Sequence, residues 1–387
     1  MKKHIVLYAS LCLVFCGCIT KYEATDIEAA ADILVVEGII TDDESTITLS
    51  QSINLMEEGY YTPIYIDNAN VSVECDDGTQ WQAEPYTPPP YSSSWSRNGQ
   101  YTIKTGQLNS DRKYRLKIEI NEIDYNSSNR IVGPGFPIYT TKTYEYFSDF
   151  SYPIQTPEID SVFWTKRGKG QPVNIHIATH SSDNQVMHYR WSYKEDWEIN
   201  SDYNLLHSGY PYYCWNSYIS KDLLLGSAEK TVFGQVTDKF FETSPSDRRF
   251  SVLYRIDVKQ NAISKRAYDY LANIKKNAEN IGSIFAPVPS ELRGNITCTT
   301  DPSRPVIGYI DISSTTQTTR YISKSDNLYE SDSNCRIISE EILSEMFDGR
   351  IPDYYVKISE GYYIEVKCVN CTFYGTTLKP DDWPNGY

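Results

Sequence analysis

The sequence lacks an apolar run long enough to cross a bilayer, which takes about 20 consecutive apolar residues. Its apolar stretch at residues 5–16 is too short for that. Positive charge is also scarce, because 36 Lys and Arg stand against 51 Asp and Glu in the 387 residues, for a net charge of −15. Nucleic-acid binding needs clustered Lys and Arg that displace counterions from phosphates. The composition therefore argues against a membrane-spanning helix and against nucleic acid as a partner.

Residues that usually carry catalysis or bind metals are few and scattered. The chain has 5 His and no Gly-x-Ser-x-Gly, His-Glu-x-x-His or phosphate-binding glycine loop. His176 and His180 fall on one face of an expected strand, but no third ligand accompanies them, so a packed or solvated strand face is favoured over a metal site. Neighbouring acids such as Glu195 and Asp196 are too common in an acidic protein to indicate glycosidase chemistry. We expect no enzyme activity, no cofactor and no metal.

Aromatic residues, by contrast, are abundant. The chain has 33 Tyr, and 40% of its residues are hydrophobic. Disordered chains are poor in aromatic residues, because they cannot bury enough apolar surface to offset the loss of chain entropy. The sequence therefore predicts a globular protein.

The N-terminus has the features of a bacterial export signal. Two lysines precede the apolar stretch, and the tetrapeptide Phe-Cys-Gly-Cys follows at residues 15–18. This tetrapeptide resembles the lipobox of bacterial lipoproteins, in which a small residue precedes the cysteine that receives the lipid. We therefore expect a signal peptide at 1–17, lipidation of Cys18 and a polar, lipidated tether at 18–32. An ordinary secretory signal is the alternative.

Alternating apolar and polar residues predict a mainly β fold with two sandwich-like domains. Residues 33–130 show short alternating segments with a turn signal about every ten residues, which is typical of an immunoglobulin- or transthyretin-like sandwich. Prolines and glycines are dense across residues 131–157, which indicates a linker. Residues 158–387 then predict a larger β-rich domain.

One packing helix interrupts the strands of the C-terminal domain. Apolar residues recur at helical spacing after Ser264, a plausible N-cap, and Gly282 can supply the C-terminal cap. A shorter helix is expected over 340–347, after Ser339. No fixed-period repeat is present, which argues against a solenoid or a propeller.

Of the nine cysteines, two lie in the signal peptide and Cys18 is the expected lipidation site, which leaves six in the mature body: Cys75, Cys214, Cys298, Cys335, Cys368 and Cys371. Six free thiols would be unusual in an oxidising compartment, so disulfides are expected, although spacing alone does not fix their pairing. We prefer bridges within Cys298, Cys335, Cys368 and Cys371, which would staple the C-terminal segment. Cys75 is then a buried free thiol. A zinc site or a redox pair at the Cys-x-x-Cys motif is the competing interpretation.

A proline-stiffened loop at residues 86–95 is the candidate binding loop. Its aromatic side chains Tyr86, Tyr91 and Trp95 could stack on a sugar or contact a partner protein. The competing interpretation is that these rings fold back on the sandwich as a lid. A second aromatic set alternates along one strand face and is more typical of a core: Trp191, Tyr193 and Trp197.

Several motifs resemble, in order, a family of Bacteroidota outer-membrane lipoproteins, the domain-of-unknown-function family numbered 4249. They are Leu-Val-Val-Glu-Gly-Ile-Ile at 34–40, Cys214-Trp215, Arg266-Ala267-Tyr268, Gly294-Asn295-Ile296, Ile307-Gly308-Tyr309, and the ending Cys368-Val369-Asn370-Cys371, Gly375-Thr376-Thr377 and Lys379-Pro380-Asp381-Asp382-Trp383. The family has no assigned chemistry, but its genes commonly lie beside those of TonB-dependent transporters.

The resemblance implies a protein of the cell envelope that is held at the outer membrane by its N-terminal lipid, on the surface or the periplasmic face. It further implies a non-catalytic accessory of a TonB-dependent barrel, which helps to capture or dock a glycan or peptide ligand. A stand-alone surface adhesin or glycan-binding lipoprotein that uses the 86–95 loop is the alternative.

Overall fold

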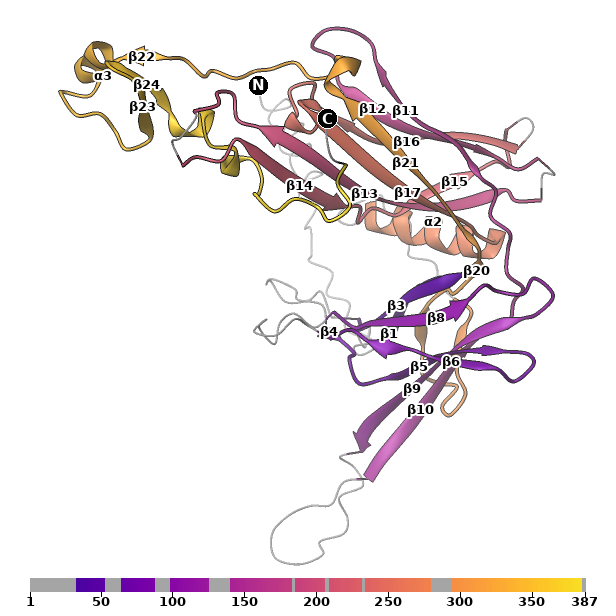
Figure 1. Ribbon diagram of the computed structural model, residues 1–387. Coiled ribbons are helices and arrows are strands. Elements are labelled where there is room, and N and C mark those ends of the chain that lie inside the picture. The colour runs from indigo at the N-terminus through magenta and orange to yellow at the C-terminus, as the bar shows by residue number, and fades with distance from the viewer. Residues whose placement is uncertain are drawn as a thin grey trace, which may run out of the picture.

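The structure, a computed structural model, describes residues 33–52, 64–87, 98–124, 140–182, 185–205, 209–231, 234–279 and 294–384. It is mainly β with a packing helix, as the sequence predicts, and its strands form two bodies with separate apolar cores (Figure 1). Cys18 and the 18–32 tether lie outside the described residues, as do Tyr91 and Trp95. None of the described helices is both long and apolar enough to cross a bilayer.

The first body is a sandwich of two sheets. Its strands are β1 (Leu34–Gly38), β2 (Ile40–Thr41), β3 (Asp43–Gln51), β4 (Ile64–Tyr65), β5 (Asn70–Cys75), β6 (Gln80–Gln82), β7 (Glu84–Pro85), β8 (Gln100–Gly106), β9 (Tyr114–Asp124), β10 (Thr140–Ser148), β18 (Ile296–Cys298), β19 (Val306–Gly308) and β20 (Ile312–Ser313). One sheet has the order β19-β1-β3-β8-β7, and the other has the order β18-β10-β9-β5-β6. Alternate residues such as Ile47, Leu49 and Val73 point into the core between them, which is the pattern that a sheet with one buried face requires.

Two features of the first body correct the expected boundaries at 33–130, 131–157 and 158–387. Thr140–Ser148 do not form a linker, because they pair antiparallel with β9 as β10. The first four residues of β10 are all exposed. This part of the strand therefore lacks the alternation of apolar and polar residues by which a strand is recognised in a sequence. The chain also returns to the first body partway through the second one, where β19 pairs parallel with β1 and β20 pairs parallel with β2. Alternation at residues 306–312 indicates a strand there, but a local pattern does not show which body that strand joins.

Two glycines allow the returning strands to approach the rest of the first body. A Cβ atom at Gly294 would lie 1.6 Å from the carbonyl oxygen of Gly308, and one at Gly308 would lie 2.5 Å from the carbonyl oxygen of Val36. Both contacts are to backbone, which cannot move aside as a flexible side chain can. The two glycine motifs of the family resemblance are therefore explained by close backbone packing.

Gly294→Ala is expected to lower the free energy of unfolding by about 3 kcal/mol, because the added methyl group overlaps backbone. Urea unfolding, with the substitution made in the Cys18→Ala protein that lacks the lipid, measures the loss. Gly106→Ala is the matched control, since a Cβ atom there meets nothing within 4 Å. That control should cost about 1 kcal/mol for its left-handed backbone alone. Equal losses at the two positions would contradict the packing argument.

The second body packs a three-stranded sheet against a five-stranded one. Its strands are β11 (Ile159–Lys166), β12 (Val173–His180), β13 (His188–Asn200), β14 (Tyr213–Ile219), β15 (Leu224–Ser227), β16 (Gln235–Thr243), β17 (Leu253–Ala262) and β21 (Thr315–Ser323). The smaller sheet has the order β11-β12-β16, and the larger has β14-β13-β17-β21 with β15 beside β13. Trp191, Tyr193 and Trp197 are buried between the sheets, which confirms that they belong to a core.

The helix α2 (Lys265–Glu279) lies between the two bodies (Figure 1). Ser264 caps its N-terminus as predicted, because its hydroxyl accepts a hydrogen bond from the backbone N–H of Ala267 at 3.1 Å. Tyr268 stacks on His188 of the second body, with 4.6 Å between ring centroids. Tyr270 meets Tyr309, which precedes the returning strand β20, at 5.8 Å. The helix therefore joins the second body to the segment that completes the first.

The last part of the chain forms an arm, defined here as residues 331–378, that projects from the second body (Figure 1). It contains β22 (Ile338–Ser339), α3 (Glu340–Met346), β23 (Tyr355–Ser359), β24 (Tyr362–Glu365) and the 3-10 turns η6 (Val366–Cys368) and η7 (Cys371–Phe373). Ser339 accepts a hydrogen bond from the backbone N–H of Ile342 and so caps α3, which confirms the predicted short helix.

Candidate functional site

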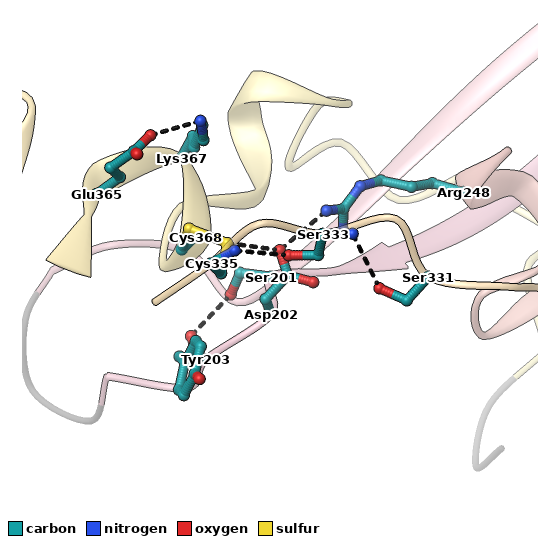
Figure 2. Close-up of a disulfide and its surroundings, with 10 residues drawn as sticks. All are labelled: Ser201, Asp202, Tyr203, Arg248, Ser331, Ser333, Cys335, Glu365, Lys367 and Cys368. Atoms are coloured by element: carbon teal, nitrogen blue, oxygen red, sulfur yellow. Dashed lines mark hydrogen bonds and ion pairs between the residues drawn. A yellow bond between two sulfur atoms is a disulfide. The ribbon is translucent and has the colours of Figure 1, made fainter. Parts of the chain in front are cut away.

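Two disulfides hold the arm. Cys335 and Cys368 close the arm on itself, with Cα atoms 5.8 Å apart (Figure 2). Cys371 of η7 is bonded to Cys214 of β14, with Cα atoms 5.7 Å apart, and this bond fastens the arm to the five-stranded sheet. The arm is thus covalently fixed at its base.

The disulfide prediction was correct in part. Cys335, Cys368 and Cys371 are bonded, but Cys298 is a buried free thiol, because β18 carries it into the core of the first body. The fourth bonded cysteine is Cys214 and not the expected Cys298. Cys75 is also a buried free thiol, as the sequence suggested. Burial raises the pKa of the Cys75 thiol, which keeps it protonated and unreactive.

The zinc alternative does not fit this arrangement. Among the described residues, Asp202, Cys335 and Cys368 form the one group of three potential metal ligands. The two sulfurs are bonded to each other, so neither is a thiolate, which is the form that binds zinc. The carboxylate of Asp202 instead accepts a hydrogen bond from Arg248 at 2.9 Å (Figure 2). This cluster therefore has a structural role at the base of the arm.

The same cluster links three separate segments of the second body. Arg248 comes from the 3-10 turn η4 (Arg248–Phe250), and its guanidinium lies 4.0 Å from the ring centroid of Tyr374. The backbone N–H of Tyr203 donates to the carbonyl oxygen of Cys368 at 2.9 Å. Polar and cation–π contacts thus reinforce the covalent attachment of the arm.

The tail after the arm, residues 379–384, docks on the outer face of the five-stranded sheet. Arg255 of β17 is 3% exposed, and its Nη2 donates to Asp196 at 2.6 Å and to Asp382 at 3.0 Å. The indole Nε1 of buried Trp383 donates to Glu198 at 3.3 Å. Burial alone would lower the pKa of Arg255, but the hydrogen bonds to Asp382 and Asp196 raise it above its ordinary value. The Asp-Asp-Trp ending is therefore a docking motif for the sheet.

The acidic pair singled out in the sequence is divided between the two faces of β13. Glu195 points into the core, where Arg249 and the hydroxyl of Tyr254 each donate to it at 2.7 Å. Burial raises the pKa of Glu195 despite these donors. Asp196 points to the opposite face and meets Arg255. Each carboxylate is thus neutralised by a guanidinium, that of Arg249 partly buried and that of Arg255 buried, and the two carboxylates do not face a common space.

The histidines at 176 and 180 make separate contacts. His176 Nε2 lies 2.9 Å from the hydroxyl of Thr165, and its ring stacks on Phe163. His180 Nδ1 lies 2.7 Å from Asp160. These partners support the interpretation of the two side chains as part of a strand face. In the candidate binding loop, Tyr86 follows β7 and is exposed, so its proposed role stays a prediction.

The structure reveals one exposed feature that the sequence reasoning missed, the apolar tip of the arm. We define the tip as Ile342, Met346, Phe347, Tyr354 and Tyr355, of which Phe347 and Tyr355 are half-buried and the other three exposed. The first two lie on α3, and the other three surround the turn that follows it. The missed signal was that α3 has apolar residues on two faces, one buried through Leu343 and one facing solvent.

A family model described as a domain of unknown function, DUF4249, matches residues 19–319. The match includes both bodies up to β21, and the motifs from residue 34 to Tyr309 fall within it. The arm and the tail lie beyond the matched range. No curated protein matches the chain.

Proposed function

The chain belongs to the DUF4249 family, and from that premise we propose that it is a non-catalytic lipoprotein of the outer membrane. In this proposal it docks with a TonB-dependent transporter and helps to capture or pass the ligand of that transporter. The observation that carries the proposal is the arm, a covalently fixed projection that presents an apolar tip to solvent. Exposed apolar patches of this kind mark protein interaction sites.

The charge of the mature protein supports a lipid anchor. Removal of residues 1–17 takes away two lysines and no acid, so the mature chain carries 34 Lys and Arg against 51 Asp and Glu, or 34 − 51 = −17. Such a body is repelled by anionic headgroups. Acyl chains contribute about 0.8 kcal/mol per buried CH₂, which outweighs a repulsion that salt screens beyond about 8 Å.

The non-catalytic part of the proposal is supported by the contacts of the acids and histidines that the sequence singled out. Glu195 is held by the partly buried guanidinium of Arg249, and Asp196 by the buried guanidinium of Arg255. His176 and His180 contact Thr165 and Asp160, respectively. These side chains therefore stabilise the sheets and the junctions between segments.

Cys18→Ala is expected to move the protein from the membrane fraction to the soluble envelope fraction, because the variant cannot receive the lipid. Cell fractionation and immunoblotting measure the shift. Cys16→Ala is the matched control, since it removes a neighbouring cysteine and leaves the lipobox residues Gly17 and Cys18 in place. A Cys18→Ala protein that stays in the membrane fraction would contradict the anchor.

Co-purification tests the partner. Outer membranes carrying a C-terminally tagged copy are solubilised in mild detergent, the protein is captured by its tag, and its partners are identified by mass spectrometry. The proposal predicts a barrel protein of the TonB-dependent class with the lipidated form and not with Cys18→Ala. Recovery of the lipidated protein alone would contradict it.

A further inference from the structure

We propose that the apolar tip of the arm is the surface that docks on the transporter, and that it binds a barrel loop in which exposed apolar residues are flanked by Arg or Lys. This inference rests on the proposed function and specifies which surface of the chain makes the contact. The partner is defined by chemistry that complements the tip, which is apolar at its centre and acidic around it.

The tip has an aliphatic part and an aromatic part. Ile342 and Met346 are one helical turn apart on α3, so their side chains lie on the same face, and they are 50% and 60% exposed. Phe347, the next residue, lies 6.4 Å from Tyr354 and 6.2 Å from Tyr355, measured between ring centroids. The two tyrosine rings are 5.0 Å apart. The tip therefore combines an exposed aliphatic face on α3 with an aromatic cluster that begins at the end of the helix.

The base of the arm holds this surface in place before any partner arrives. One disulfide joins Cys335 to Cys368 within the arm, and the other joins Cys371 of the arm to Cys214 of β14. Arg248 adds a cation–π contact to Tyr374 and an ion pair to Asp202, 2.9 Å long. A surface that is already ordered loses less conformational entropy on binding, so more of its contact free energy appears as affinity.

The charge around the tip selects the kind of partner. Glu340, Glu341 and Glu345 are exposed on α3, which carries no Lys or Arg. In the turn that follows, two exposed acids, Asp348 and Asp353, outnumber the one exposed base, Arg350. An anionic lipid surface would repel these carboxylates. A second copy of this chain would bring the same acids against them, on a mature protein whose net charge is −17. A basic, apolar protein loop is the partner that this pattern attracts.

Photo-crosslinking in living cells tests the contact. A photoreactive phenylalanine replaces Met346 in the full-length, lipidated protein, and a matched replacement is made at Ile123, which is 53% exposed on β9 of the first body. We expect position 346 to cross-link to the barrel protein through a peptide that contains Arg or Lys, with yields at least tenfold higher than at position 123. The proposal would be overturned if position 346 gave no cross-link. It would also be overturned if position 346 cross-linked only to lipid, to a second copy of this chain or to another part of the same chain.

A charge variant separates this inference from the proposed function. Ile342→Glu with Met346→Glu changes two solvent-facing side chains, and Ile123→Glu is the control. The inference predicts at least a tenfold loss of the co-purified barrel for the double variant and none for the control. If the double variant captures as much barrel as the unaltered protein, the docking surface is wrong while the proposed function stands. If the unaltered protein captures no barrel, both fall.

Discussion

Arg249→Met is expected to lower the free energy of unfolding by about 3–5 kcal/mol at pH 8, because it leaves a buried carboxylate without its cation. Glu195 is 1% exposed, and its Oε1 accepts from Arg249 Nη1 at 2.7 Å. The remaining donor is the hydroxyl of Tyr254, which carries no charge. Urea unfolding of the soluble Cys18→Ala protein gives the loss directly.

The same variant should show a characteristic pH dependence. Burial raises the pKa of Glu195, and removal of Arg249 raises it further, since the guanidinium lowers that pKa. A folded carboxyl with a raised pKa holds more protons than the unfolded one, so stability falls as pH rises above the unfolded pKa of about 4.3. The variant should therefore lose more stability at pH 8 than at pH 5.

Lys239→Met is the matched control for Arg249→Met. Lys239 pairs with Glu242 at 3.2 Å, but both side chains are half-exposed, and surface pairs of this kind contribute about 0–1 kcal/mol. Equal effects of the two substitutions, or a loss at Arg249 that does not grow with pH, would contradict the structural role assigned to Glu195.

Removal of the Cys214–Cys371 disulfide by a double Ala substitution should have the second large effect. The bond joins residues 157 positions apart, and closing a loop of that length restricts the unfolded chain by about 5 kcal/mol. It also fastens the arm to β14, so its loss should expose the junction at residues 371–378 to limited proteolysis. Denaturant unfolding and protease digestion measure the two consequences.

The other disulfide provides the comparison. Cys335 and Cys368 are 33 positions apart, so the corresponding double Ala variant should lose about 4 kcal/mol while the arm stays attached to β14. We therefore expect earlier cleavage at the base of the arm in the Cys214 variant than in the Cys335 variant. The opposite order of cleavage would show that the arm is not held through Cys214.

Much of the fold could be predicted because local patterns reveal it. The helix α2 was found from its cap and its apolar spacing, and the buried face of β13 from its alternating aromatic residues. The returning strands β18, β19 and β20 could not be assigned to the first body, although residues 306–312 alternate as a strand does. Their place in the fold depends on pairing with strands far away in the sequence, which a local pattern does not encode.

The site was harder to predict for a similar reason. The spacing of the cysteines does not encode which of them meet, so the partner of Cys371 was missed. The apolar tip was missed because a sequence pattern does not distinguish an exposed apolar face from a buried one. Leu343 is buried and Ile342 is exposed, although the two are neighbours of similar hydrophobicity.

The most direct test of the account is the composition of the native complex at the outer membrane. The tagged, lipidated protein is released in mild detergent, and the complex that contains it is weighed by native mass spectrometry. The account predicts a mass that corresponds to this chain bound to one TonB-dependent barrel, which is lost in Cys18→Ala and reduced in Ile342→Glu with Met346→Glu. A mass that corresponds to this chain alone, for the lipidated protein, would contradict it.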